Sequence, residues 1–340
     1  MTNFNADRKG DIMIEKIRIY ESKNLDPYRN LATEKYLMDT TAPGECTLYL
    51  WQNQNTVVIG SNQNAWVECR TTLLEQERGK LARRLSGGGA VFHDIGNLNF
   101  TFMARKESYD LDRNLAVIKR ACAYAGVTAE KSGRNDLLAE GRKFSGNAFY
   151  QNKTHAYHHG TLLINVDMEK LQRYLSPSKA KLEAKGIASV RSRVINLQEL
   201  NPSLSCEVMK QHMTNAFETE YGLKATLVTL TEEDMAAIDT LTREYGSWDY
   251  LYGTPLPFTF SCESRYNWGG VQLQLQAKGG IITAVKVYSD SMDWQLPQQV
   301  EQALTGCKFQ LDAMQESLRT GLSQQEMADD LCNLLAEQSL

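Results

Sequence analysis

The chain has few prolines and cysteines, and it contains no long apolar run. Its 340 residues include 7 prolines and 7 cysteines. The cysteines are odd in number, lie far apart and form no C-x-x-C pair, so neither a disulfide framework nor a zinc ribbon is expected. No window approaches the roughly 18 apolar residues of a membrane span, and the polar N-terminus lacks the apolar core of a signal peptide. These features predict a cytoplasmic protein with free, mostly buried thiols.

An excess of positive charge is also missing. The formal net charge is −4 and the pI is about 5.8. A broad basic face for nucleic acid is therefore not expected. Hydrophobic residues make up 42% of the chain, enough for a sizeable core. The length suits one large and one small domain, and Pro255 and Pro257 mark a break between them. We predict a large domain over residues 1–252 and a small accessory domain over 253–340.

The periodicities predict an α+β fold. Asp26 is a candidate N-cap for a helix that begins at Pro27. Alternation over 97–103 indicates a strand, and the step of three and four residues after Leu115 indicates a helix that Gly126 ends. Further strands are expected in 13–22 and 47–63, and several short ones in 130–166. Helices are expected near 168–174, near 208–221 and at the C-terminus, and a hairpin over 271–290. Most strands are close in sequence, which favours a mixed, mostly antiparallel sheet with flanking helices.

The stretch RRLSGGGAVFHDIGN, residues 83–97, combines three consecutive glycines with two arginines. It is not a P-loop, and Phe92 stands where a dinucleotide fingerprint needs its last glycine. A flexible hairpin loop is the simplest interpretation of three glycines. The adjoining Arg83, Arg84 and His93 favour a second one, in which loop amides and fixed positive charge bind an anion.

Two further clusters contain polar side chains. The first holds Asn135, Asp136 and Lys143, the last of these just before Ser145-Gly146. By itself Lys143 is typical of a solvated surface lysine, but beside small residues it is a candidate for binding an anion. The second cluster, HAYHHG, offers three histidines, but neighbouring residues of a strand point to opposite faces. Zinc is therefore not expected there.

Several longer motifs in the chain resemble the lipoate–protein ligase A family. They are NLATEKYL, TVVIGSNQNAW, RRLSGGGAVFHDIGN, SGRNDL, GRKFSGNA, HHGTLLIN and KGIASVRSRVINL, in family order over most of residues 26–197. RYNWGGVQL and VYSDS resemble the family's small accessory domain more loosely. The resemblance implies the fold shared with biotin ligases and class II aminoacyl-tRNA synthetases.

The resemblance also implies an activity. Family members activate lipoate with ATP as lipoyl-AMP and pass the lipoyl group to a lysine. The acceptors are lipoyl domains of 2-oxoacid dehydrogenase E2 subunits or the glycine-cleavage H protein. Mg²⁺ is expected with ATP, with no metal ligand assigned, and the chain is expected to be a monomer without nucleic-acid or membrane partners.

The resemblance assigns site residues as well. Lys143 is expected to be catalytic, because it binds both lipoate and the adenylate phosphate. The ATP and adenylate contacts are expected at Arg84, Gly89, Ala90, Val91, Phe92, Asn135, Asp136, Lys143 and Lys185. The lipoate contacts are expected at Arg84, Ser86, Gly87, Gly88, His93 and Lys143. The lysine-rich segment 176–194, which composition alone would make a solvent loop, is expected to be the adenylate-binding loop and to become protected when lipoyl-AMP forms.

Three alternatives stay open at this point. An octanoyltransferase of the same superfamily would carry its acyl group on a cysteine, and no cysteine lies between Cys122 and Cys206. A biotin ligase would carry an arginine-glycine repeat motif that this sequence lacks. A non-catalytic lipoyl-binding protein on the same scaffold would have no need of both Arg84 and Lys143. The sequence does not rank lipoate against octanoate.

Overall fold

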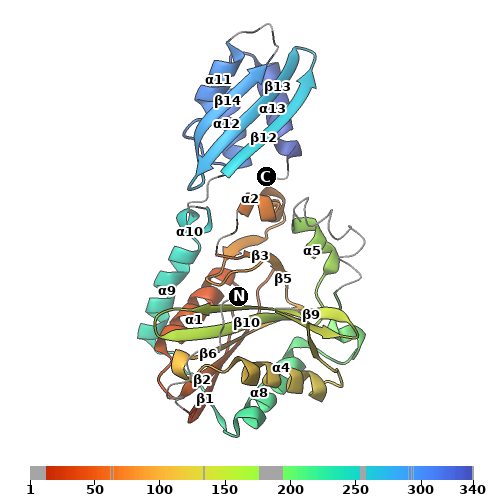
Figure 1. Cartoon of the computed structure of the whole chain (residues 1–340). Coiled ribbons are helices and arrows are strands. Elements are labelled where there is room, and N and C mark those ends of the chain that lie inside the picture. Colours follow the sequence, from red (N-terminus) through yellow and green to blue (C-terminus); the bar gives the residue numbers. More distant parts are fainter. Residues whose placement is uncertain are drawn as a thin grey trace.

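An eight-stranded mixed sheet forms the base of the larger part of the molecule (Figure 1). The computed structural model describes residues 13–61, 63, 65–132, 135–175, 194–252, 258–289, 291, 293 and 295–338. In spatial order the strands are β11 (Ala225–Leu227), β1 (Lys16–Glu21), β2 (Glu45–Trp51), β6 (Asn97–Arg105), β10 (His155–Leu163), β9 (Arg142–Gln151), β8 (Asp136–Ala139) and β7 (Glu130–Ser132). Strand β1 runs parallel to β2 and β11, and all other neighbours are antiparallel.

Helices cover both faces of this sheet. Helices α4 (Leu111–Tyr124) and α8 (Cys206–Tyr221) lie below it in Figure 1 and share one core cluster with Phe100 and Phe102 of β6. Helices α1 (Pro27–Thr40) and α9 (Glu232–Tyr245) pack against the opposite face, around Tyr49 and Met103. Two short 3₁₀ turns, Lys106–Ser108 and Leu197–Glu199, complete the connections. With both faces covered, β6 is buried along eight of its nine residues, Arg105 being the exception.

A second, three-stranded sheet stands above the first. Its order is β4 (Lys80–Arg83), β3 (Thr56–Ile59) and β5 (Val91–His93), and it is flanked by α2 (Ala65–Glu68), α3 (Thr71–Gln76) and α5 (Met168–Tyr174). The glycine run connects β4 to β5, the two outer strands of this small sheet.

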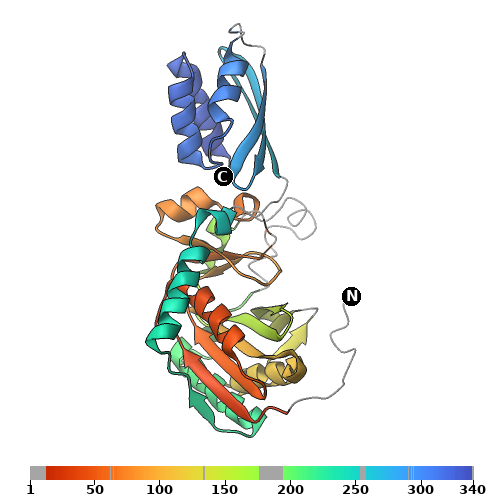
Figure 2. The same cartoon turned by 90° about the vertical axis from the view of Figure 1, so that its left-hand side faces the viewer.

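The C-terminal residues form a third sheet with helices on one side (Figure 2). Strands β12 (Phe258–Tyr266), β13 (Gly269–Lys278) and β14 (Ile281–Ser289) form a meander backed by α11 (Leu296–Leu304), α12 (Leu311–Gly321) and α13 (Gln325–Glu337). This unit contacts the rest through Trp66 and Phe309, whose ring centroids lie 4.9 Å apart. A division of the chain at 252/253 stays a prediction.

Most predicted elements are confirmed. Asp26 caps α1 by accepting a hydrogen bond from the Tyr28 amide, and Gly126 ends α4 with a φ of 74°. Gly279 and Gly280, with φ values of 61° and 73°, form the turn between β13 and β14. The structure differs from the prediction at β9 and β10, which are long strands of ten and nine residues where short ones were expected. Strands β2 and β3 also belong to different sheets, and α1 forms a crossover between the parallel β1 and β2.

Among the described residues, no helix is both long and apolar enough to cross a lipid bilayer.

Candidate active site

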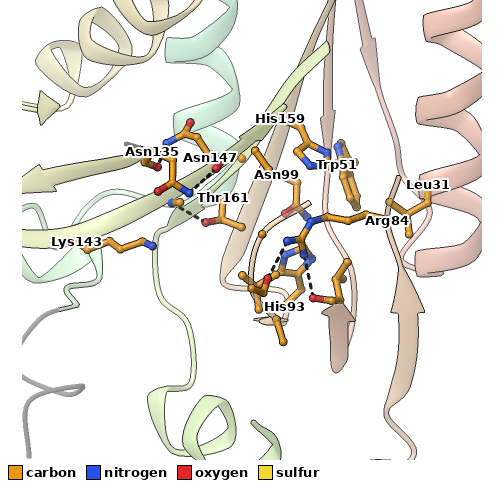
Figure 3. Close-up of a pocket in the computed structure, with 18 residues that line it drawn as sticks. Leu31, Trp51, Arg84, His93, Asn99, Asn135, Lys143, Asn147, His159 and Thr161 are labelled. Atoms are coloured by element: carbon orange, nitrogen blue, oxygen red, sulfur yellow. Dashed lines mark hydrogen bonds between the residues drawn. The ribbon is translucent and has the colours of Figure 1, made fainter. Parts of the chain in front are cut away.

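A pocket lies between the large sheet and the glycine run (Figure 3). Its empty volume is about 700 Å³, part of it open to solvent. It is lined from α1, β2, β3, the glycine run, β5, β6, β9 and β10. Lys143 and Asn135 lie on one side in Figure 3, and Trp51, His93, Asn99 and Leu31 lie on the other.

Arg84 holds the glycine run in shape. Its Nη2 donates hydrogen bonds of 2.8 Å to the carbonyls of both Gly87 and Gly89, and its Nη1 donates to the Val58 carbonyl. Its Nε donates to Ser86 Oγ at 3.0 Å. The side chain is 7% exposed, and burial lowers the pKa of the guanidinium to about 10, so it stays charged at neutral pH. Arg84 therefore brings a positive charge to the pocket while most of its donors organise the loop.

Arg83 faces the other way. Its guanidinium donates to the carbonyls of Tyr250 and Leu251, at the end of α10 (Trp248–Tyr252). It also donates to the carbonyls of Gly60, Ser61 and Gln63. A cation at carbonyls that end a helix is favourable, and five carbonyls compensate its burial. The adjacent arginines thus support the pocket from two sides.

The glycines are required where backbone segments meet. A Cβ at Gly60 would lie 2.4 Å from the Gly88 carbonyl oxygen, closer than real Cβ contacts. Gly88 has a φ of 96°, which side chains rarely adopt, and its Cβ would lie 3.1 Å from Arg84 Nη2. A Cβ at Gly87 or Gly89 would meet nothing within 4 Å. Glycine is therefore strictly required at Gly60 and Gly88. The two neighbours of Gly88, Gly87 and Gly89, keep the surface next to the pocket open.

A buried chain of hydrogen bonds connects the glycine run to α1. Ser86 Oγ lies 2.7 Å from His159 Nε2, and His159 Nδ1 lies 2.8 Å from Glu34 Oε1. The same carboxylate oxygen accepts from Thr101 Oγ1 at 2.6 Å. The Glu34 carboxylate accepts from Nδ1–H, and Nε2 contacts the Ser86 hydroxyl, which in turn accepts from Arg84 Nε. The Glu34 charge thereby compensates that of Arg84 without touching it.

A second buried chain sets the protonation of His93. Asn30 Nδ2 donates to the backbone carbonyls of Asn24 and Gln52 and also to Asn53 Oδ1. This fixes the Asn53 amide, whose Nδ2 lies 3.2 Å from His93 Nδ1. His93 Nδ1 must then accept, which leaves the proton on Nε2. Burial lowers the pKa of His93 to about 3, and the nearby Arg84 charge adds to the shift, so the imidazole is neutral.

Lys143 stands at an irregularity of β9. The pairing of β8 with β9 shifts there, because Leu137 pairs with Ser145 while Leu138 pairs with Lys143. Such a bulge redirects side chains and is common beside active sites. Lys143 Nζ lies 2.7 Å from Asp136 Oδ1, in a pair whose side chains are 36% and 37% exposed. A cation in such an exposed pair is weakly held and available to an incoming anion.

Two asparagines lie next to this lysine. Asn135 Nδ2 donates to the Asn147 carbonyl at 2.9 Å, and Asn147 Nδ2 donates to the Asn135 carbonyl at 3.0 Å. Asn147 Oδ1 lies 2.8 Å from His158 Nε2. This reciprocal pairing fixes the turn before β8 at the edge of the pocket (Figure 3).

The pocket gathers most of the predicted site residues. Those that line it are Arg84, Gly88, Gly89, Ala90, Val91, His93, Asn135 and Lys143. Ser86 and Asp136 do not line it but contact Arg84 and Lys143. Gly87 contributes a carbonyl to Arg84, and the side chain of Phe92 packs in the core against Tyr174. Lys185 and residues 176–193 of the predicted adenylate-binding loop, which was expected over 176–194, lie outside the described residues.

Other lining residues were not predicted, among them Trp51, Asn99, Asn147 and Thr161. Strand β6 carries a signal for one of them. In NLNFTF, Asn97, Asn99 and Thr101 alternate with apolar residues, and both sets are buried. A buried strand with one polar face indicates that this face lines a polar site rather than a core.

Comparison with known proteins identifies the chain. Residues 26–218 match the model of the lipoyl protein ligase A/B catalytic domain, and residues 256–335 match that of the bacterial lipoate protein ligase C-terminus. The chain is 40% identical over 312 residues to a lipoate-protein ligase A of Bdellovibrio bacteriovorus, covering 90% of this chain and 92% of that one. It is 42% identical over 302 residues to that of Psychrobacter cryohalolentis, covering 86% and 89%.

The fold agrees with these relatives. A bipartite lipoate protein ligase of Thermoplasma acidophilum, solved in a study that includes its E2 lipoyl domain, aligns with a TM-score of 0.62 at 23% identity. The alignment covers 71% of this chain and 97% of that one. The predicted α+β fold with a mostly antiparallel sheet is therefore confirmed. With both family models and two relatives at 40% identity or more, the chain belongs to the lipoate–protein ligase A family.

Proposed function

We propose that the pocket binds lipoate and ATP together, that Lys143 serves the formation of lipoyl-AMP, and that the lipoyl group then passes to a protein lysine. One observation carries this assignment. The pocket has a half-buried lysine on one side and apolar side chains, Trp51, Leu31 and Val58, among those that line it elsewhere. That is the arrangement needed for an acid with an apolar tail and a single carboxylate.

Charge explains why Lys143 is needed. The carboxylate of lipoate must attack the α-phosphate of ATP, and both groups are anions. The Nζ of Lys143 neutralises both at once when it leaves Asp136. Arg84 adds a second fixed positive charge from beneath the glycine run. The same groups stabilise the negative charge on the oxygens around the pentacoordinate phosphorus, and pyrophosphate departs as the acyl–phosphate bond forms.

The glycine run is suited to the adenylate. Arg84 holds the Gly87 and Gly89 carbonyls, which supports the amides of Gly89, Ala90 and Val91 as contacts for the ligand. Asn135, whose Nδ2 donates to Asn147, has an amide oxygen that we propose as a further contact at the edge of the same pocket. These residues are our proposed ATP and adenylate contacts. Lys185 belongs to the family motif KGIASVRSRVINL, and this supports it as a further contact to the adenylate.

Mg²⁺ would accompany ATP as a charge-neutralising ion. Among the described residues, no three His, Cys, Asp or Glu side chains group in a way that could hold a metal. Asp136 is the carboxylate next to Lys143. The residues therefore fit an ion that is held mainly by phosphates and water, with Asp136 as an indirect ligand, which is the usual way that Mg²⁺ binds with nucleotides.

Members of this family act on lipoyl domains, and we propose E2 lipoyl domains and glycine-cleavage H protein as acceptors for this chain. We also propose a monomer. All seven cysteines are free, which supports a reducing compartment such as the cytoplasm.

The test is acceptor modification. The purified protein is incubated with ATP, Mg²⁺ and lipoate in the presence of an apo-lipoyl domain or apo-H protein, and the intact acceptor mass is measured. A gain of one lipoyl group on one lysine, absent when ATP is withheld, is expected. Unmodified acceptors together with no lipoate-dependent ATP–pyrophosphate exchange would contradict the proposal.

An acyltransferase that uses a cysteine is the alternative. Of the seven cysteines, all of which the structure describes, none lines the pocket. The thiol pKa values of Cys69 and Cys122 are raised to about 12 by burial, which makes them poor nucleophiles. Transfer that continues without ATP from an acyl carrier protein would favour the alternative.

A further inference from the structure

The side of the pocket away from Lys143 holds two buried polar groups without partners. His93 Nε2 and Asn99 Nδ2 have no hydrogen-bond partner in the part of the chain that the structure describes. Their residues are 3% and 1% exposed, and both line the pocket. An unpaired buried donor costs free energy, so such groups indicate a ligand that pairs with them.

The His93 donor is fixed by geometry. The chain from Asn30 through Asn53 ends on His93 Nδ1, so the proton must reside on Nε2, at the other edge of the ring. Trp51 holds the ring in place with an edge contact at 6.1 Å between centroids. His93 therefore offers one N–H in one direction.

The Asn99 donor has a similar cause. Its Oδ1 accepts from Asn97 Nδ2 at 2.9 Å, which leaves Nδ2 for the pocket. Asn99 pairs with Trp51 on one neighbouring strand and with Thr161 on the other. Both partners also line the pocket, so Asn99 stands between Trp51 and Thr161 on the sheet that forms this part of the pocket (Figure 3).

We propose that His93 and Asn99 select lipoate over octanoate by donating hydrogen bonds to the dithiolane sulfurs. This rests on the proposed function, with the carboxylate at Lys143 and the acyl tail directed to the opposite side. The sulfurs are weak acceptors that satisfy both donors. The tail of octanoate has only methylene and methyl groups, so its binding leaves both donors buried and unpaired. Polar sites reject substrates that lack the matching group far better than apolar pockets reject a change of size.

The experiment compares three acids in ATP–pyrophosphate exchange with the whole protein. They are lipoate, octanoate and the carbocyclic analogue of lipoate in which methylene groups replace both sulfurs. The analogue keeps the ring and chain length, so the ratio of kcat/KM for lipoate to that for the analogue isolates the sulfurs. The wild type is expected to favour lipoate over both other acids, and Asn99→Leu, which replaces the amide with an apolar group of similar size, is expected to reduce both ratios by about tenfold or more.

Two further variants make the result specific. His93→Phe is expected to shift the ratios in the same direction. Val58→Ala enlarges the same pocket without touching either donor, so it is expected to reduce kcat/KM for all three acids while leaving their ratios within about threefold. Should Val58→Ala move the ratios as far as Asn99→Leu, size and not hydrogen bonding would set the preference.

The outcome also separates this inference from the proposed function. Equal use of lipoate and its carbocyclic analogue by the wild type would overturn the inference and leave the ligase activity intact. No exchange with any of the three acids would overturn the proposed function itself. If Asn99→Leu unfolds, His93→Phe measured against Val58→Ala decides the question on its own.

Discussion

His159 Nδ1 lies 2.8 Å from Glu34 Oε1, in a contact where both side chains are buried. Thr101 donates to the same oxygen. We predict that Glu34→Ala, which leaves both donors unpaired, lowers the free energy of unfolding by about 1–3 kcal/mol. Glu34→Gln keeps an acceptor oxygen, so its free energy of unfolding is expected to fall by less than that of Glu34→Ala. Urea unfolding measures both changes, with Glu316→Ala, an exposed glutamate on α12, as the control. Equal stability of Glu34→Ala and the control would contradict the prediction.

Loss of the Lys143 ammonium is expected to abolish activation rather than folding. The side chain is 36% exposed and pairs with Asp136, which is itself partly exposed, so Lys143→Met removes little packing. Removing one preorganised donor to a developing charge reduces kcat by about 10²–10³. Lipoate-dependent ATP–pyrophosphate exchange is the measurement, and Lys153→Met, an exposed lysine in the β9–β10 turn, is the matched control. A folded Lys143→Met protein with wild-type exchange would refute the role.

Adjacent glycines are expected to respond in opposite directions. Gly88→Ala places a Cβ at a φ of 96° and 3.1 Å from Arg84 Nη2, which is expected to cost about 1–3 kcal/mol. Gly87→Ala meets nothing within 4 Å and restricts the unfolded chain, so its free energy of unfolding is expected to rise by about 0.4–1 kcal/mol. Thermal and urea unfolding of the pair test this. Two equal changes would mean that the loop adapts to either side chain.

Acid is expected to destabilise the protein through two neutral histidines. Burial lowers the pKa values of His93 and His158 to about 3, from 6.5. The unfolded chain therefore binds more protons below pH 6.5, so the stability that these groups contribute is complete above that pH and is lost as the pH falls. Each contributes a slope of about 1.4 kcal/mol per pH unit below the unfolded value.

His158→Gln tests this pH dependence. Glutamine retains a donor for Asn147 Oδ1 but does not titrate. Between pH 6 and pH 5, the free energy of unfolding of the variant is expected to fall less steeply than that of the wild type. The difference in slope is that of one titrating histidine. Parallel curves for the two proteins would show that His158 does not resist protonation in the folded state.

The sequence predicted the elements near the site better than their assembly. Alternation in β6 and the cap at Asp26 are local, and both are confirmed. The small sheet was not predicted, because β4 is only four residues long and pairs in parallel with β3. Strand β11 and helix α9 were missed for a related reason, since β11 forms by pairing with β1 and α9 packs against α1, about 200 residues earlier.

In the site, too, the local motifs could be predicted from the sequence and their assembly could not. The glycine run and Lys143 are recognisable from short motifs, and the structure brings them to one pocket. The Glu34–His159–Ser86 chain is not, because its members come from α1, β10 and the glycine run, and only the folded sheet places them together. The bulge that positions Lys143 is likewise a property of strand pairing, which has no short sequence signature.

The two sides of the pocket differ in their exposure to solvent. A change in ionic strength can therefore distinguish their contributions to binding. The Lys143–Asp136 pair is more than one-third exposed, whereas His93 and Asn99 are buried and uncharged. At 0.15 M salt exposed charges are screened over about 8 Å, while buried neutral donors are not affected. Added salt is therefore expected to weaken the binding of every acid alike through its carboxylate. The preference among acyl tails will persist unchanged at high salt, so affinity and selectivity in this enzyme are physically independent quantities.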